Sequence, residues 1–387
     1  MSNWYWKLLL INLSKNLLHK TVVILLLCMV NILTYGQNSD YYLYTGTYTR
    51  KGSEGIYVHQ FNSKTGDFKL VSIAKGITNP SFLAISPNQN FLYSLAGNKG
   101  DSVKAFSIEK PSHHLTLLNS QSLAGSSGAC HLEVDKTGRW LIVGNYSSGS
   151  ITVLPIQPNG MLGNAIQTIT HEGKSIDPER QQKPFVHSIN VAPNNKDVFV
   201  PDLGTDKIMT YTLSAETGKL SSAEKPFTSV TPGSGPRHFT FHPNGKFVYV
   251  IQEMSATITG FNYKDGALEV FQEVKNLPDD YTGRKWAADI HISPDGKFLY
   301  GSNRAHESLV IFSINKKTGK LTFVGHQPVN GKTPRNFAID PTGNFILVAN
   351  QDSDSITIFK RDSTTGKLTS TGKEITISQP VCLKFIP

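Results

Sequence analysis

A segment of about 50 residues recurs along the chain, and this repeat constrains the fold more than any other feature of the sequence. Each copy contains two short apolar runs joined by a turn such as Pro-Asn-Gly or Pro-Asp-Gly, which is the pattern of two strands in a hairpin. The clearest copies are at residues 235–249, 288–300 and 333–347, and weaker copies are at 79–93, 128–142 and 185–199. Strand-like units at such a period are typical of a β-propeller.

A seventh copy of the segment begins at residues 381–387, where the chain ends. The strands that would complete it stand near the other end of the chain, at residues 41–49, 55–63 and 68–76. We therefore predict an all-β, seven-bladed propeller. Its last blade would combine a C-terminal inner strand with three N-terminal strands, which closes the ring and leaves no large open sheet edge.

A second turn recurs within the blades, and its glycines are Gly218, Gly319 and Gly366. A tight hairpin of this kind requires a positive φ, which glycine adopts without steric cost. Beyond the N-terminal leader, no long stretch shows a 3.6-residue apolar period, so we expect little helix.

The leader at residues 1–36 resembles a secretory signal. Three lysines precede an apolar run at residues 21–33, and the run leads into small and polar residues. The apolar run is short for a membrane span. We predict cleavage after Gly36 and one propeller domain at residues 37–387, with an uncleaved N-terminal anchor as the alternative.

This leader predicts export to the periplasm or the extracellular space, whereas the protein would be cytoplasmic if the leader does not function. After cleavage we expect a monomer with no stable membrane association. Without the three lysines of the leader the formal net charge falls from +9 to +6. This charge is spread over turns, and no basic run alternates with aromatic residues, so nucleic-acid binding is not expected. Cys130 and Cys382 are expected to be unpaired buried thiols.

Charged side chains gather at two positions of the repeat, the opening pair of the inner strand and the end of the next strand. Because adjacent strands are antiparallel, both positions are expected at one mouth of the central channel. Charges crowded there need pairing or an anionic ligand. The charged and histidine side chains predicted at this mouth are His131, His187, Arg237, His238, Glu253, Asp289, Arg304 and Arg335.

Guanidinium groups bind carboxylates and phosphates, a histidine and a glutamate can transfer protons, and an arginine can stabilise an oxyanion. The sequence contains no Gly-x-Ser-x-Gly motif, phosphate-binding glycine loop or dinucleotide fingerprint. The predicted site therefore fits the opening or closure of a small anionic lactone without a cofactor. A metal site built on Glu253 and Asp289 is disfavoured by the surrounding arginines.

Three motifs resemble the seven-bladed propeller lactonase family, which includes the bacterial propeller-type 6-phosphogluconolactonases and the fungal carboxy-cis,cis-muconate cyclases. They are GPRHFTFHPNGKFVYVIQE at 235–253, ADIHISPDGKFLYGSNR at 288–304 and TPRNFAIDPTGNFILVANQDSDSITIF at 333–359. The resemblance extends over residues 41–387 and implies cofactor-free lactone chemistry at the channel mouth.

The histidine, two arginines and glutamate assigned as the working set of the cyclase branch fall on His187, Arg237, Arg304 and Glu253 of this sequence. We expect Glu253 and His187 to act as acid and base, and Arg237 and Arg304 to anchor substrate and stabilise the oxyanion. Arg335 is expected to make a further anion contact. The side chains expected to support the rim are His131, His238 and Asp289.

The expected reaction is hydrolysis of a sugar lactone, with 6-phospho-D-glucono-1,5-lactone, converted to 6-phosphogluconate, as the leading substrate. The export signal also points to an unphosphorylated external sugar lactone. Two alternatives stay open: a lactonising cyclase of muconate-like dicarboxylates, and an exported propeller without catalytic activity that binds a sugar acid or a protein.

Overall fold

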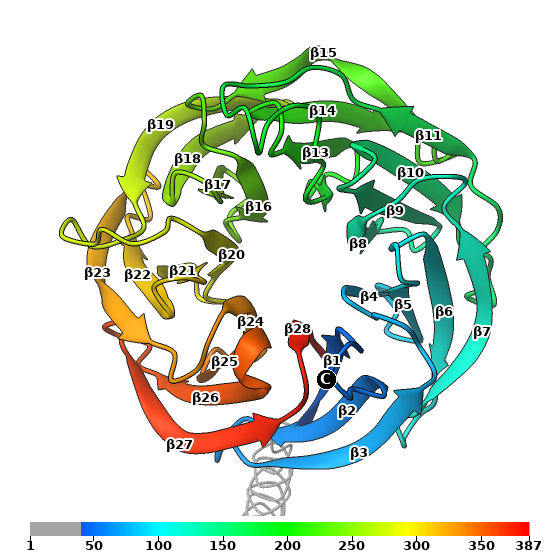
Figure 1. The fold of residues 1–387 in the computed structure, drawn as a ribbon, viewed down its shortest axis with the longest axis horizontal. Helices are drawn as coiled ribbons and strands as arrows, with labels where there is room; N and C mark the ends of the chain where they lie inside the picture. Colours follow the sequence, from blue (N-terminus) through cyan, green and yellow to red (C-terminus); the bar gives the residue numbers. More distant parts are fainter. Residues whose placement is uncertain (1–39, 387) are drawn as a thin grey trace, which may run out of the picture. The chain divides into compact units, whose positions relative to one another are not determined.

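Short runs of alternating apolar and polar residues build the whole fold. In the computed structural model, which describes residues 40–386, 28 strands form seven four-stranded antiparallel sheets. Figure 1 shows these sheets as blades around a central axis, with one edge strand of each blade innermost. The predicted seven-bladed propeller is confirmed. The predicted leader at residues 1–36 lies outside the described residues.

The blades follow one another along the chain. Blade 1 contains β4 (Leu83–Ile85), β5 (Phe91–Ala96), β6 (Ser102–Ile108) and β7 (Leu115–Ser122). Blade 2 contains β8 (Ala129–Val134), β9 (Trp140–Asn145), β10 (Ser150–Pro155) and β11 (Gln167–Thr170). Blade 3 contains β12 (Asn190–Val191), β13 (Asp197–Asp202), β14 (Lys207–Leu213) and β15 (Leu220–Ser229).

The second half of the ring repeats this arrangement. Blade 4 contains β16 (Pro236–Phe241), β17 (Phe247–Gln252), β18 (Thr257–Lys264) and β19 (Ala267–Lys275). Blade 5 contains β20 (Ala287–Ile292), β21 (Phe298–Asn303), β22 (Ser308–Ile314) and β23 (Leu321–Pro328). Blade 6 contains β24 (Pro334–Ile339), β25 (Phe345–Asn350), β26 (Ser355–Arg361) and β27 (Leu368–Thr376).

Blade 7 joins the two ends of the propeller, as predicted. Its inner strand is β28 (Pro380–Ile386), and its other strands are β1 (Asp40–Thr47), β2 (Gly55–Asn62) and β3 (Phe68–Lys75). β28 pairs with β1 from Tyr42↔Ile386 to Thr47↔Pro380. Backbone hydrogen bonds between β28 and β1 therefore close the ring.

Helix is scarce, as expected. The 3-10 turn η1 (Gln351–Ser353) is the only helical element among residues 40–386. No helix in the described part of the chain is long and apolar enough to cross a membrane.

The hydrophobic core lies between neighbouring blades. Phe199 of blade 3 stacks on Phe239 of blade 4, with ring centroids 5.4 Å apart, and both belong to one buried cluster with Phe261. Each blade thus buries its faces against the blades beside it, which is how a propeller forms one unit from repeats that could not fold alone.

Glycine turns connect the blades as well. Gly319 and Gly366 have φ values of 70° and 73°, which confirms the predicted positive φ. A Cβ atom placed on Gly366 would lie 2.3 Å from the Phe298 ring of the preceding blade. The carbonyl oxygen of Gly366 accepts a 2.8 Å hydrogen bond from Tyr300 of that same blade. The turn therefore packs closely on its neighbour only because it lacks a side chain.

Bulges at the start of several inner strands direct consecutive side chains into the channel. The register of β16 and β17 passes from Pro236↔Gln252 to His238↔Ile251, which leaves Arg237 without a partner in the ladder. Arg335 of β24 is skipped in the same way. A bulge turns a side chain away from strict alternation, so these arginines face the channel beside their successors.

Candidate active site

A basic cavity of about 510 Å³ opens where the inner strands begin. Its walls come from the first residues of the inner strands and from the loops that follow the second strands. Glu253 is the only carboxylate among its lining residues, and His187 is also part of the lining. The cationic side chains that line it are Arg50, Lys99, Arg180, Arg284, Arg304 and Arg335. This excess of positive charge favours an anionic ligand.

Glu253 lies at the centre of an arginine cluster and is only 4% exposed. Its Oε1 accepts a 2.6 Å hydrogen bond from Arg180, and its Oε2 accepts bonds of 3.0 Å from Arg237 and 2.7 Å from Arg304. Burial alone would raise the pKa of Glu253, but the charges of Arg304 and Arg237 and the bond from Arg180 hold it below its ordinary value. Glu253 is therefore ionised, with both oxygens occupied.

Arg237 and Arg304 are held rigidly by the backbone of blade 5. Arg237 Nη1 donates to the carbonyl of Ala288 at 2.6 Å, and Arg304 Nη2 donates to the carbonyl of Ala287 at 2.8 Å. The guanidinium carbon of Arg304 also lies 3.9 Å from the ring centroid of Trp286. These two guanidiniums are fixed before any ligand binds.

Arg335 differs from these two arginines. Among residues 40–386 its guanidinium has no carboxylate or hydrogen-bond partner, and it faces the Tyr48 ring, whose centroid lies 5.7 Å from the guanidinium carbon. Because it borders the basic cavity, this guanidinium is free to bind an anion that enters.

His187 is a buried neutral base beside Arg335. Burial, followed by the charge of Arg237 and the neighbouring His238, holds the pKa of His187 well below its usual range. Its Nδ1 lies 3.8 Å from the Cys130 sulfur. The other ring nitrogen, Nε2, is the one that does not face Cys130. His187, Arg237 and Arg335 line one recess of about 20 Å³, which has room for one water molecule.

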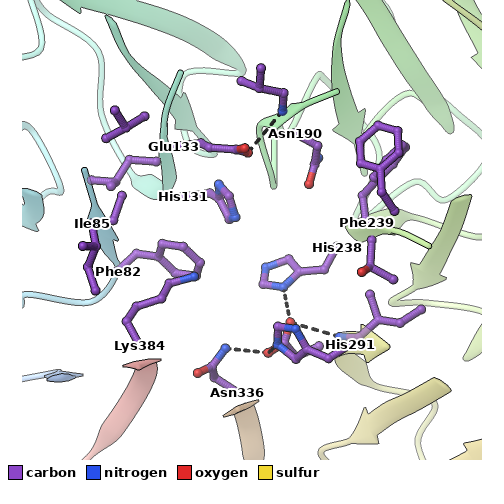
Figure 2. Close-up of a pocket in the computed structure, with 18 of the residues that line it drawn as sticks. Phe82, Ile85, His131, Glu133, Asn190, His238, Phe239, His291, Asn336 and Lys384 are labelled. Atoms are coloured by element: carbon purple, nitrogen blue, oxygen red, sulfur yellow. Dashed lines mark hydrogen bonds and ion pairs between the residues drawn. The ribbon is translucent and has the colours of Figure 1, made fainter. Parts of the chain in front are cut away.

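The structure separates three of the predicted rim residues from this cavity. His131, His238 and Asp289 line a distal cavity of about 460 Å³, reached further along the inner strands (Figure 2). The expectation of one shared rim is corrected here, because the bulges place successive residues at two levels of the channel. Arg237 precedes His238, yet only His238 borders the distal cavity.

Sequence reasoning missed Arg180, the third arginine on Glu253. It lies in the connection between β11 and β12, outside the regular part of the repeat. When the repeats are aligned on the turn after the inner strand, the interval from Lys136 to Pro193 is longer than any other, so an insertion between blades 2 and 3 was visible in the sequence. Nothing in the repeat indicated that this insertion would reach a carboxylate in blade 4.

Cys130 and Cys382 are both free, as predicted. Cys382 is buried in blade 7 and accepts a hydrogen bond from the Leu83 amide at 3.3 Å, whereas Cys130 borders the basic cavity. Burial raises the pKa of the Cys130 thiol to about 12 and that of Cys382 to about 11. Both side chains are therefore protonated thiols rather than nucleophiles near neutral pH.

The comparisons with known proteins agree with this geometry. Residues 42–385 match the family described as lactonase, 7-bladed beta-propeller. The 6-phosphogluconolactonase of Bacillus subtilis is 37% identical over 351 residues, which cover 90% of this chain and 99% of that protein. The 6-phosphogluconolactonase of Formosa agariphila is 40% identical over 307 residues, covering 77% of this chain and 86% of that protein.

A solved structure resembles the fold closely. The periplasmic gluconolactonase of Pseudomonas aeruginosa superposes with a TM-score of 0.86 at 32% identity, covering 90% of this chain and 99% of that one. This agreement extends over the whole propeller.

Proposed function

Since the chain belongs to the seven-bladed β-propeller lactonase family and is a carboxylic-ester hydrolase that opens lactones, we propose that it hydrolyses 6-phospho-D-glucono-1,5-lactone to 6-phosphogluconate in the basic cavity. The observation that carries this proposal is the charge of the cavity. Six cationic side chains line the cavity around one carboxylate, and only two of them, Arg180 and Arg304, bind this carboxylate together with Arg237. The remaining cations are available to a doubly anionic phosphate.

The cations divide into an outer and an inner group. Arg50 and Arg284 are exposed, and their guanidinium carbons lie 5.0 Å from the Tyr48 ring centroid and 4.2 Å from the Trp286 ring centroid. These aromatic rings hold the two arginines at the outer part of the site. We assign the substrate phosphate to the outer group and the lactone carbonyl to the part of the basic cavity beside Arg335, next to the recess.

Hydrolysis then needs only a water molecule and the residues of the recess. Neutral His187 takes a proton through Nε2 from water in the recess, and the water oxygen attacks the lactone carbonyl carbon. The carbonyl oxygen becomes an oxyanion, which Arg335 and Arg237 stabilise. When this intermediate collapses, the ring C–O bond breaks, and His187 returns the proton to the departing ring oxygen. The product is the open-chain hydroxy acid.

Glu253 takes a positioning role in this scheme. An ionised carboxylate that already accepts hydrogen bonds from three guanidiniums is a weak proton acceptor. We therefore narrow the acid–base role expected for both Glu253 and His187 to His187 alone. Glu253 instead fixes the orientation of Arg237 and Arg304.

An unphosphorylated sugar lactone is a second candidate substrate. The predicted leader at residues 1–36 favours export, and the similar Pseudomonas aeruginosa protein is described as a periplasmic gluconolactonase. We propose that this chain is exported too, and an exported enzyme would meet external lactones. Such a substrate has no phosphate, so the outer arginines would contribute little to its binding.

Acid release from 6-phosphogluconolactone and from glucono-1,5-lactone, corrected for spontaneous hydrolysis, tests these proposals. Arg335→Met should lower kcat/KM for both lactones about tenfold or more, because it removes a charge-assisted contact to the reacting group. The double variant Arg50→Met/Arg284→Met should lower kcat/KM about tenfold or more for the phosphorylated lactone alone.

Each result has a clear meaning. Equal loss with both lactones in the double variant, or no loss with either, would overturn the assignment of the phosphate to Arg50 and Arg284. Failure of the unmodified protein to accelerate either reaction would overturn both substrate proposals.

A further inference from the structure

The distal cavity is a second polar chamber that the proposed reaction does not use. Glu133, His131, His238, His291 and Lys384 surround one space, and aromatic side chains such as Phe239 complete its walls (Figure 2). A cavity of about 460 Å³ is large enough for a small organic ligand.

Aromatic rings separate this chamber from the basic cavity. Phe82 packs on His131 with ring centroids 4.3 Å apart, and His187 and His238 meet edge to face with centroids 5.4 Å apart. Between them lies the recess of about 20 Å³, which shares His187 with the basic cavity and His238 with the distal cavity. A ligand in the distal cavity would therefore occupy a site distinct from that of the substrate.

Asp289 fixes the hydrogen-bonding state of two histidines in this chamber. Its Oδ1 lies 2.7 Å from His238 Nδ1, and its Oδ2 lies 2.9 Å from His291 Nε2. Burial alone would raise the pKa of Asp289, but its hydrogen bonds with these two histidines and the nearby charge hold it well below its usual range. An ionised carboxylate only accepts, so both ring nitrogens must donate to it. Burial lowers the pKa of His238 to about 4, so this ring is neutral and its opposite nitrogen, Nε2, is an acceptor.

The other side of the chamber supplies donors. His131 Nδ1 accepts a 3.2 Å hydrogen bond from the Ile189 amide, so in the neutral ring Nε2 carries the proton. Glu133 accepts from the Val191 amide at 3.2 Å, and burial raises the pKa of Glu133 to about 8. Glu133 is thus mostly a neutral carboxylic acid, and donor, at pH 7.

Lys384 provides the positive charge of the chamber. Its Nζ lies 4.9 Å from the Phe82 ring centroid, and within residues 40–386 it forms no ion pair with a carboxylate. The nearby acid, Glu133, is mostly neutral at pH 7 and does not compensate this charge. An ammonium group held against an aromatic wall, with no partner of its own, is suited to a ligand carboxylate.

We propose that the distal cavity binds a small hydroxylated carboxylate, with its carboxylate on Lys384 and its hydroxyl groups on His238 Nε2 and on the His291 ring. His131 and Glu133 donate to the remaining oxygens, and Phe239 packs on the carbon chain. A divalent cation fits less well, because no three His, Cys, Asp or Glu side chains group as metal ligands anywhere in the described range. The proposed ligand has the same chemistry as the product of a sugar lactonase.

Calorimetric titration with D-gluconate tests this proposal on the whole protein. Because gluconate also resembles the product of the proposed reaction, Lys384→Met and Arg335→Met are titrated in parallel to distinguish the two cavities. We expect two binding events in the unmodified protein. Lys384→Met should weaken one of them about tenfold or more, whereas Arg335→Met should weaken only the other.

Lys384→Met should also retain the lactone turnover and the melting temperature of the unmodified protein. These two results together would show that the loss of gluconate binding is local to the distal cavity. Lys384→Arg keeps the charge and should retain the binding. If Lys384→Met leaves every gluconate binding event unchanged, or if Arg335→Met removes all of them, the proposal is overturned. Binding is measured without turnover, so this outcome does not depend on the proposed function.

Discussion

Glu253 and His187, the two central residues of the basic cavity, both have lowered pKa values. As a result Glu253 is an anion, whereas His187 is neutral. Glu253 loses its proton because three guanidiniums outweigh its burial, whereas His187 loses its proton because burial and the nearby Arg237 charge act together. The site therefore combines a carboxylate that stays ionised, Glu253, with a histidine that stays neutral, His187. This pairing is why we assign proton transfer to His187 and orientation to Glu253.

The pH dependence of activity should report the state of His187. Its ordinary pKa is about 6.5, and its depressed pKa keeps the ring neutral as the pH falls through that value. We therefore expect kcat/KM for glucono-1,5-lactone, which carries no titrating phosphate, to stay constant between about pH 7.5 and 5.5, once spontaneous hydrolysis is subtracted. His187→Gln should lower kcat/KM about 10²-fold or more at every pH in this range.

A decline in kcat/KM with a midpoint near the ordinary histidine pKa would contradict this assignment. It would mean that the base of the working enzyme is a solvated histidine rather than the buried His187. Unchanged activity in His187→Gln would contradict it as well.

Turn glycines are the elements that hold neighbouring blades at contact distance. Gly366→Ala should lower the free energy of unfolding by about 2–4 kcal/mol, because it combines a strained positive φ with a clash against Phe298. Gly372 is a matched control, since it has a φ of 72° and a Cβ placed on it would meet no atom within 4 Å. Gly372→Ala should cost only about 1–2 kcal/mol from strain.

Urea denaturation of both variants measures this difference directly. Equal destabilisation by the two substitutions would show that the turn of blade 6 does not depend on its contact with blade 5. A larger loss in Gly366→Ala would show that the absence of one side chain sets the distance between these blades.

At the scale of the whole molecule, the two ends of the propeller meet in blade 7, so Asp40 begins a strand of the closed ring. Removal of a leader that precedes this strand would leave every strand of residues 40–386 in place. We expect the exported protein to begin at Gln37, with its mass measured after cell fractionation. Leu25→Arg/Leu26→Arg interrupts the apolar run of the leader and should keep the chain in the cytoplasm.

Recovery of the intact chain from the membrane fraction would instead support an uncleaved anchor. Recovery of the intact, unmodified chain in the cytoplasm would show that the leader does not function, and would remove the argument for an external substrate.

The architecture could be predicted from the residues alone, because each property that specifies a propeller is local or repeated. The number of copies of the segment predicted the number of blades, and the turn residues predicted the hairpins. The incomplete copy at 381–387 predicted the closing blade. Differences arose at strand ends: the predicted strand at 41–49, for example, ends at Thr47. Hydrogen bonding, rather than residue type, decides where such a strand stops.

The tertiary structure alone decided how the functional side chains divide between two cavities. Alternation along a strand cannot reveal that a bulge turns Arg237 and His238 toward the channel at successive levels. Nor can it reveal that Arg180, from an irregular connection in another blade, reaches Glu253. These placements depend on register and on contacts between distant segments. Residue types therefore indicated the chemistry of the site, whereas only the folded ring determined which residues share it.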